Sequence, residues 1–309
     1  MIDELLNRNT VNINLDSDGL LSYLFLKMGG FNGSIGGYNH SNNEILSIYP
    51  TLEEMWNDAF IDIFVPNEKT FTIDQHILCG LFTDTKFGKN KINPHLLIEE
   101  HFANDTSYFK KYPFSTCLFI MAILERENKN IPILDFSIPT KLDTISLGDL
   151  ILRADGVLLN YNKYNDNVKY WGDKMINYSN NGANTQNIIN YLFGHTKMEA
   201  KEKNENISNF YKKYGLTKDG GYNNNDTLTN NIHLLNGLIK AFSKYMDIKV
   251  EKKEIQFYHY RGNDVFLESN RFDVNLNSFD TYSFVGKDKL SYTINYHKLD
   301  DVIHTEIFA

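Results

Sequence analysis

Residues 11–22 constrain the fold more than any other segment, because they join a strand to a helix through two carboxylates. Apolar residues alternate with asparagines over residues 11–15, which is the period of a β-strand. Asp16 and Asp18 follow, and Gly19 allows a tight turn into an apolar helix. Carboxylates at the carboxyl end of a strand occupy the edge where open α/β sheets bind ligands. Two carboxylates this close repel each other unless a hard cation lies between them, so the pattern predicts a metal site.

Composition excludes several classes of protein. The 309 residues are 42% hydrophobic, which is enough for a buried core, and the net charge of −8 argues against general binding to duplex nucleic acid. This balance favours a small anionic substrate held through metal. Cys79 and Cys117 fit a reduced compartment and form no zinc pattern. Because no apolar run reaches the length of a membrane span and no signal peptide is recognisable, we expect a soluble, cytoplasmic protein without a membrane partner.

Strand-like and helix-like segments alternate over the first half of the chain. The expected strands after residue 15 are 33–39, 60–65 and 71–76, and the expected helices are 51–56, 115–125 and 146–155, with another that begins at Pro94. This alternation predicts an α/β fold with a mostly parallel sheet that is covered by helices on both faces.

The sequence becomes more polar from about residue 161. The expected elements are helices at 185–193, 198–214 and 228–245, a loop at 219–226, and strands at 249–260, 264–276 and 281–296. We therefore predict a first domain over residues 1–198, a helical linker over 199–226, and a smaller C-terminal α+β domain on the substrate side over 227–309.

Acidic residues recur at the predicted strand ends. Beyond Asp16 and Asp18, the candidates are Asp62, Asp74 and Asp155, and in a parallel sheet the strand ends converge on one edge. Two divalent cations about 3.5–4 Å apart need a bridging carboxylate and several further ligands. Asp62 is the natural bridge, because a lone acid within an apolar strand otherwise carries a heavy desolvation cost.

This arrangement resembles the DHH phosphoesterase superfamily, which includes RecJ-type exonucleases and oligoribonucleases. Residues 16–22 resemble its Asp-x-Asp-Gly-x-x-Ser motif, Asp62 resembles the acid of its second motif, and residues 73–77 resemble the Asp-His-His signature. Residues 114–117 and 148–155 are similar to the Ser-led helix and to the segment with the last acid. The motifs occur in the family's order and cover roughly the first half of the chain.

The resemblance implies a two-metal site that holds Mn²⁺ or Mg²⁺. It assigns the metal ligands Asp16, Asp18, Asp62, Asp155, Asn12 and Gln75. It assigns catalysis to Asp62 and to His76, which would stabilise the developing charge on the phosphate, and it places Ser22 at the substrate.

Other candidate substrate-binding residues follow from local sequence. Lys89, Lys91 and His95 surround the start of a helix, where free backbone amides can hold a phosphate. A solvated loop is the alternative for this segment. Arg153 either neutralises a substrate phosphate or pairs with Asp149.

Two departures from the family pattern weaken the expected metal site. Asn12 stands where the family has His or Asp, and Gln75 stands where it has the first His of the signature. Amide oxygens bind Mg²⁺ more weakly than imidazole binds Mn²⁺, so the sequence indicates either harder, weaker metal binding or a retired active site. The family's Gly-Gly-Gly-His loop is not recognisable, since Gly220 and Gly221 are followed by Tyr222.

The sequence therefore predicts a metal-dependent phosphoesterase that hydrolyses a nucleotide, a short oligonucleotide or a single-stranded nucleic-acid end. A homodimer is left open. One alternative is a degenerate relative that binds a nucleotide or a partner protein without turnover. Another is a phosphatase of the haloacid-dehalogenase type with Asp16 as nucleophile. Helix capping is a further alternative for Asp16 and Asp18.

Overall fold

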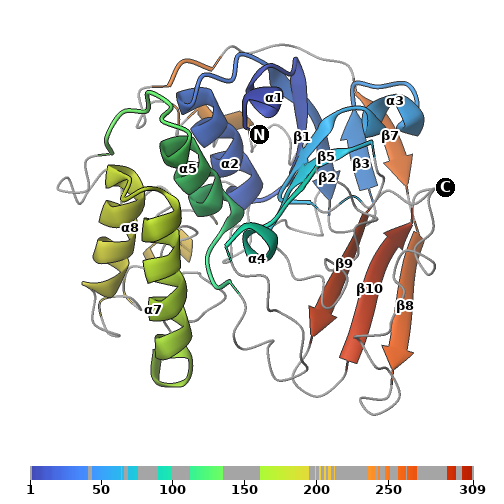
Figure 1. Ribbon diagram of the computed structural model, residues 1–309. Helices are drawn as coiled ribbons and strands as arrows, with labels where there is room; N and C mark the ends of the chain where they lie inside the picture. The colour runs from blue at the N-terminus through green and yellow to red at the C-terminus, as the bar shows by residue number, and fades with distance from the viewer. Residues whose placement is uncertain are drawn as a thin grey trace. The chain divides into compact units, whose positions relative to one another are not determined.

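The computed structural model describes residues 2–40, 44–63, 65, 69–75, 90–98, 112–134, 161–194, 257–261, 263–269, 291–296 and 301–307, with scattered positions between 199 and 250 (Figure 1). The chain divides into two compact units. A helical unit comprises Met1–Asn7, Leu15–Asn32 and Pro113–Glu254, and a sheet unit comprises Arg8–Asn14, Gly33–Tyr112 and Ile255–Ala309. The expected helix at 146–155 and loop at 219–226 lie outside the described residues.

The sheet unit is built on a seven-stranded, mostly parallel sheet with the order β6-β5-β4-β1-β2-β3-β7. Its strands are β1 (Thr10–Asn14), β2 (Ser34–His40), β3 (Glu44–Ser47), β4 (Ala59–Ile61), β5 (Phe71–Ile73), β6 (Lys91–Ile92) and β7 (Tyr258–Arg261). The strands from β6 to β2 run parallel, whereas β3 pairs antiparallel with both β2 and β7. The predicted α/β class with a mostly parallel sheet is confirmed.

The strand order reverses beside β1. The chain passes from β1 to β2 and β3 on one side, then returns to β4 on the other side of β1 and continues outward to β5 and β6. Open α/β sheets bind ligands beyond the carboxyl ends of the strands that flank such a reversal. The topology therefore marks the edge between β1 and β4 as the place where a ligand is expected.

Strand β4 is shorter than predicted, because its backbone turns at Asp62. The expected strand covered residues 60–65, but β4 ends at Ile61 and Asp62 has a left-handed φ of 61°. Aspartate tolerates this conformation better than most residues, since its short polar side chain bonds locally. Asp62 thus lies at the carboxyl end of β4, the edge at which open α/β sheets bind ligands, instead of within the strand.

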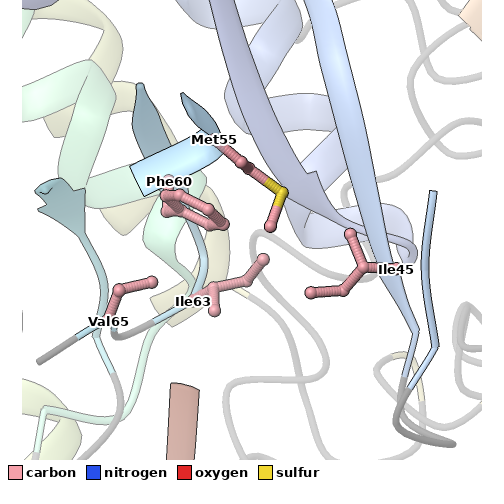
Figure 2. Close-up of a cluster of buried hydrophobic side chains, with 5 residues drawn as sticks. All are labelled: Ile45, Met55, Phe60, Ile63 and Val65. Carbon is pink, nitrogen blue, oxygen red and sulfur yellow. The ribbon is translucent and has the colours of Figure 1, made fainter. Parts of the chain in front are cut away.

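An apolar cluster fixes β3 and β4 to the short helix α3 (Leu52–Trp56). Figure 2 shows its members, which are Ile45, Met55, Phe60, Ile63 and Val65. Thr51 caps α3, which was expected at 51–56, by accepting a hydrogen bond from the Glu54 amide at 3.2 Å. Tyr260 of β7 packs on the same cluster, and its hydroxyl donates to the Tyr49 carbonyl at 2.8 Å. These contacts hold a strand from the end of the chain on the sheet formed by its beginning.

A second sheet of three antiparallel strands is formed by the C-terminal residues. Its order is β8-β10-β9, with β8 (Asn263–Ser269), β9 (Ser291–Tyr296) and β10 (Asp301–Ile307). The strands expected at 264–276 and 281–296 correspond to β8 and β9, whereas β10 was not expected from the sequence. The predicted domain boundaries stay a prediction, although β7, which they assign to the C-terminal domain, is an edge strand of the large sheet.

The helical unit is organised around α5. Its elements are α1 (Ile2–Leu6), α2 (Ser17–Met28), α5 (Thr116–Arg126), α7 (Tyr161–Tyr178) and α8 (Ala183–Phe193). Helix α5 packs against α2, α7 and α8, and α7 and α8 lie side by side (Figure 1). Helix α4 (Pro94–Leu97) belongs to the sheet unit and begins at Pro94, as predicted. Within the described parts of the chain, none of the helices is both long and apolar enough to cross a bilayer.

In two helices of this unit, the first backbone amides donate hydrogen bonds to a carboxylate from another helix. Asp18 of α2 accepts hydrogen bonds from the backbone amides of Thr116 and Cys117 at 2.8 Å each. Glu125 of α5 accepts from the amides of Asn184 and Thr185 at 2.6 and 3.0 Å. The first amides of a helix lack an intrahelical acceptor and carry partial positive charge, so carboxylates bind them well. These contacts link α2 to α5 and α5 to α8.

The glycine at the start of α8 leaves room for Glu125, and this can be tested. A Cβ on Gly182 would lie 2.1 Å from Glu125 Oε2, so Gly182→Ala should lower the free energy of unfolding by about 1–3 kcal/mol. The matched control is Gly194→Ala at the other end of α8, where the nearest atom is 3.3 Å away and little change is expected. Urea denaturation measures both. Equal stability of the two variants would contradict the cap.

Candidate functional site

Five polar residues lie in register at the carboxyl ends of the parallel strands, and we call them the carboxyl-edge row. In strand order they are Asn39, Asn14, Asp62, Asp74 and Asn93, on or directly after β2, β1, β4, β5 and β6. The Asp62 amide donates to the Ile73 carbonyl at 2.8 Å and the Asp74 amide to the Ile92 carbonyl at 3.0 Å, which continues the ladder one residue further. All are buried except Asn14, which is half-buried.

The pairing of β1 with β2 places Asn14 and Asn39 on the same face of the sheet. A Cβ on Gly37 would lie 2.3 Å from Asn12 Oδ1, so Gly37 and Asn12 face the same side. Asn39 and Asn14 are two residues further along their strands and are register partners. Because side chains alternate along a strand, both return to that face.

Asp62 is fixed by its neighbour in the row. Asn14 Nδ2 donates a hydrogen bond to Asp62 Oδ2 at 3.3 Å, and only 3% of Asp62 is exposed. This contact orients one carboxylate oxygen of Asp62.

Asp16 and Asp18 each accept hydrogen bonds from backbone amides at the start of a helix. Asp16 is the N-cap of α2, and its side chain accepts from the Gly19 amide at 2.9 Å, as the capping alternative predicted. Asp18 instead binds the start of α5, and only 8% of it is exposed. The structure therefore gives each carboxylate of the Asp-x-Asp motif a structural contact, and a role in metal binding stays a prediction.

Asn12, at the centre of β1, is held by contacts with the amino end of β4. Its Nδ2 donates to Asp58 Oδ2 at 3.2 Å and to the Ala59 carbonyl at 3.3 Å, at the amino end of β4. Asp58 Oδ2 also accepts from Thr10 Oγ1 at 2.7 Å and from the Tyr49 hydroxyl at 3.2 Å. Burial raises the pKa of Asp58 to about 6, although these hydrogen bonds oppose the shift. The amide assigned to a metal by family resemblance is thus part of a buried network that joins β1 to β4.

The other predicted substrate residues that the structure describes are enclosed. Lys91 Nζ donates to the Thr70 carbonyl at the amino end of β5, and burial lowers the pKa of Lys91 to about 7. The ring of His95 is buried, with Nε2 accepting from the Tyr112 amide at 3.4 Å, and Ser22 is fully buried in α2.

Gln75 is half-buried and directly follows Asp74, so it stays beside the carboxyl-edge row. The remaining predicted site residues lie outside the described residues; they are His76, Lys89, Arg153 and Asp155.

The side chains of the carboxyl-edge row carry the oxygen ligands that a hard cation prefers. The row offers only carboxylate and amide groups, and their oxygens are the ligands that Mg²⁺ and Mn²⁺ accept. Asn39 Oδ1 is buried without a hydrogen-bond partner among the described residues, and such an atom calls for a water, a cation or another ligand. Within the same described residues, no three His, Cys, Asp or Glu side chains gather closely enough to hold a metal ion. A cation here would depend on amide oxygens as well as on acids.

Comparison of the chain with protein-family models found no match, and comparisons with curated proteins and with solved structures found none either. The resemblance to the DHH superfamily therefore depends on the order of the sequence motifs.

Sequence reasoning did not select Asn14, Asn39 or Asn93 as site residues. A local signal existed, because asparagine is disfavoured in strands and each of these residues lies within one residue of the end of a strand. What the sequence could not supply was the register that brings them together. Asn93 has a second role, since its side chain caps α4 by accepting from the His95 amide at 3.0 Å.

Asp18 can be tested as a helix cap independently of any metal. Asp18→Ala should lower the free energy of unfolding by about 2–3 kcal/mol in the presence of a chelator, because two amides at the start of α5 lose their acceptor. Asp3→Ala is the control, since Asp3 pairs with Lys129 at the surface and a surface ion pair contributes little. Chemical denaturation measures both. A change below about 0.5 kcal/mol in Asp18→Ala would contradict the cap.

Asp58 should make stability depend on pH. Its pKa rises from 3.8 to about 6 on folding, so its contribution to stability is complete below pH 4 and is lost as the pH rises through 6. Asp58→Asn keeps an acceptor for Thr10 and Tyr49 but does not titrate. The stability of the wild type relative to this variant should therefore fall by up to about 3 kcal/mol between pH 4 and 7. Parallel curves in urea denaturation at a series of pH values would contradict the buried carboxyl.

Proposed function

We propose that this protein is a divalent-cation-dependent phosphoesterase of the DHH type, with its site on the carboxyl-edge row. The observation that carries the proposal is the placement of Asn14, Asp62 and Asp74 on three neighbouring parallel strands beside the reversal of strand order. We further propose that the substrate is a nucleotide, a short oligonucleotide or a single-stranded nucleic-acid end, as the motif order implies.

Electrostatics support a cation at this edge. Asp62 and Asp74 are 3% and 1% exposed and follow adjacent strands. Two carboxylates on adjacent strand ends repel each other, and a cation bound between them would remove this repulsion. A fixed pair of acids at a ligand-binding edge is therefore better explained by a positive partner than by an apolar ligand.

In this proposal, some residues of the row bind the cation and another orients its ligand. Asp62 and Asp74 would hold the cation, while Asn14 keeps the carboxylate of Asp62 in one orientation through its amide nitrogen. A divalent cation bound there would polarise a phosphoryl oxygen and lower the pKa of a water molecule. The motif resemblance adds Asp16, Asp18, Asp155 and Gln75 to the ligands and gives His76 the developing negative charge to stabilise.

A binding protein without turnover is the second candidate. Two positions of the family pattern make contacts of the fold, since Asn12 is held by Asp58 and Asp18 caps α5. A chain that has lost strong metal ligands can keep a nucleotide site and lose the chemistry. Activity and binding must therefore be measured separately.

The test is hydrolysis of bis(p-nitrophenyl) phosphate, a generic phosphodiester, with Mn²⁺ or Mg²⁺. Wild-type protein should show activity that chelator abolishes, and Asp62→Asn should reduce it about 100-fold, because a metal ligand becomes a neutral amide. Asp173→Asn on the exposed surface of α7 is the control and should leave the rate unchanged. Thermal unfolding in chelator shows whether each variant is folded.

The outcomes separate the two candidates. Metal-dependent hydrolysis that disappears in Asp62→Asn supports the phosphoesterase. Saturable binding of AMP to the wild type without any hydrolysis supports the binding protein instead. Absence of both hydrolysis and metal binding would contradict the phosphoesterase.

A further inference from the structure

Asn39 has a buried oxygen that nothing in the described parts of the chain satisfies. The residue is 8% exposed, and its Oδ1 has no hydrogen-bond partner among the described residues. A buried amide oxygen left without a donor costs free energy, so such an atom in a folded protein calls for a water, a cation or a ligand. Asparagine is also a poor strand residue, and an apolar side chain would suit a buried strand better.

The position of Asn39 decides which of these partners fits. It is the register partner of Asn14 on β2, on the same face of the sheet and at the same carboxyl edge. Asn12 Oδ1, at the centre of β1, is another buried oxygen without a hydrogen-bond partner among the described residues, and Ser22 Oγ and Thr185 Oγ1 belong to helices α2 and α8. Of these four oxygens, only Asn39 Oδ1 belongs to the carboxyl-edge row. Asn39 is thus an unsatisfied acceptor within a row of oxygen donors.

We propose that Asn39 provides an oxygen ligand to the cation at the carboxyl-edge row. This inference depends on the proposed function, because it requires a divalent cation at this edge. It goes beyond that function by assigning a ligand that the family motifs do not contain. Asn39 would supply an amide oxygen at this edge, whereas the amide nitrogen of Asn12, at the centre of β1, donates to Asp58 and to the Ala59 carbonyl.

The spacing of strands is compatible with this role. Asn39 lies one strand from Asn14 and two strands from Asp62. At about 4.8 Å between neighbouring strands, the backbones of Asn39 and Asp62 are about 10 Å apart. Two short side chains and two metal–oxygen bonds of about 2.1 Å can cover that distance. Asn14 lies between them and fixes Asp62 by the nitrogen end of its amide.

The experiment measures Mn²⁺ binding directly, by the EPR signal of the free ion and by calorimetry, on the full chain. Asn39→Leu removes the oxygen at nearly constant volume and should weaken binding about 10-fold. Asn39→Asp replaces a neutral oxygen by a charged one and should tighten it several-fold. Asp62→Asn should abolish saturable binding. Thermal unfolding in chelator establishes that each variant is folded.

Asn9→Asp is the matched control. It adds the same charge to the sheet unit at an exposed position directly before the amino end of β1, outside the carboxyl-edge row. If Asn39→Asp tightens Mn²⁺ binding and Asn9→Asp does not, the oxygen of residue 39 contacts the ion. Equal tightening in both variants would show a general effect of charge and overturn the assignment.

Failure of this inference differs from failure of the proposed function. If the wild type binds Mn²⁺ and Asp62→Asn does not, but both Asn39 variants bind like the wild type, the assignment of Asn39 is wrong and the cation site stands. If the wild type shows no saturable binding, both are wrong. Should Asn39→Leu not fold, Asn39→Asp decides, since unchanged or weaker binding contradicts a ligand role.

Discussion

The reversal of strand order beside β1 is the constraint on which the rest of this account depends. Strand β1 lies between β2, which precedes β3 in the chain, and β4, which follows it. The carboxyl ends of the parallel strands β2, β1, β4 and β5 therefore lie at one edge of the sheet. Polar side chains buried there are not satisfied by the strand ladder and need other partners. One consequence is the bond from Asn14 to Asp62, and another is the unsatisfied oxygen of Asn39.

The polar face of β1 serves two purposes along its length. Thr10 and Asn12, at its amino end and centre, bind Asp58 and tie β1 to the beginning of β4. Asn14, at its carboxyl end, donates a hydrogen bond to Asp62 at the candidate site. A single alternation of polar residues therefore supplies both the network that holds the strands together and the first member of the candidate site. This separation explains why Asn12 and Asn14, two residues apart, have different roles.

Local chemistry made part of this fold predictable. The alternation that ends at Asp16 predicts β1 and α2, Thr51 predicts the start of α3, and Pro94 predicts α4. The end of β4 was missed, because the strand pattern continues through Asp62 and only its left-handed backbone interrupts it. Helix α7 was missed because its sequence is polar, with apolar residues on only part of its surface.

Contacts between distant segments could not be predicted from the sequence. Strand β3 pairs with β7 across more than half of the chain, and Asp18 caps a helix that begins 98 residues later. No local pattern encodes these partners, so the sequence indicates for Asp18 only a metal ligand or a cap of its own helix. The candidate site was predictable as a set of acids at strand ends, whereas its amides became apparent only with the register.

Anomalous scattering from a Mn²⁺-soaked crystal tests the central claim most directly, because it locates the ion without requiring turnover. The account predicts a peak at the carboxyl-edge row, within coordination distance of the Asp62 carboxylate and with the Asn39 oxygen directed toward it. A soaked crystal with no peak near Asp62, or with peaks only at surface carboxylates, would contradict it.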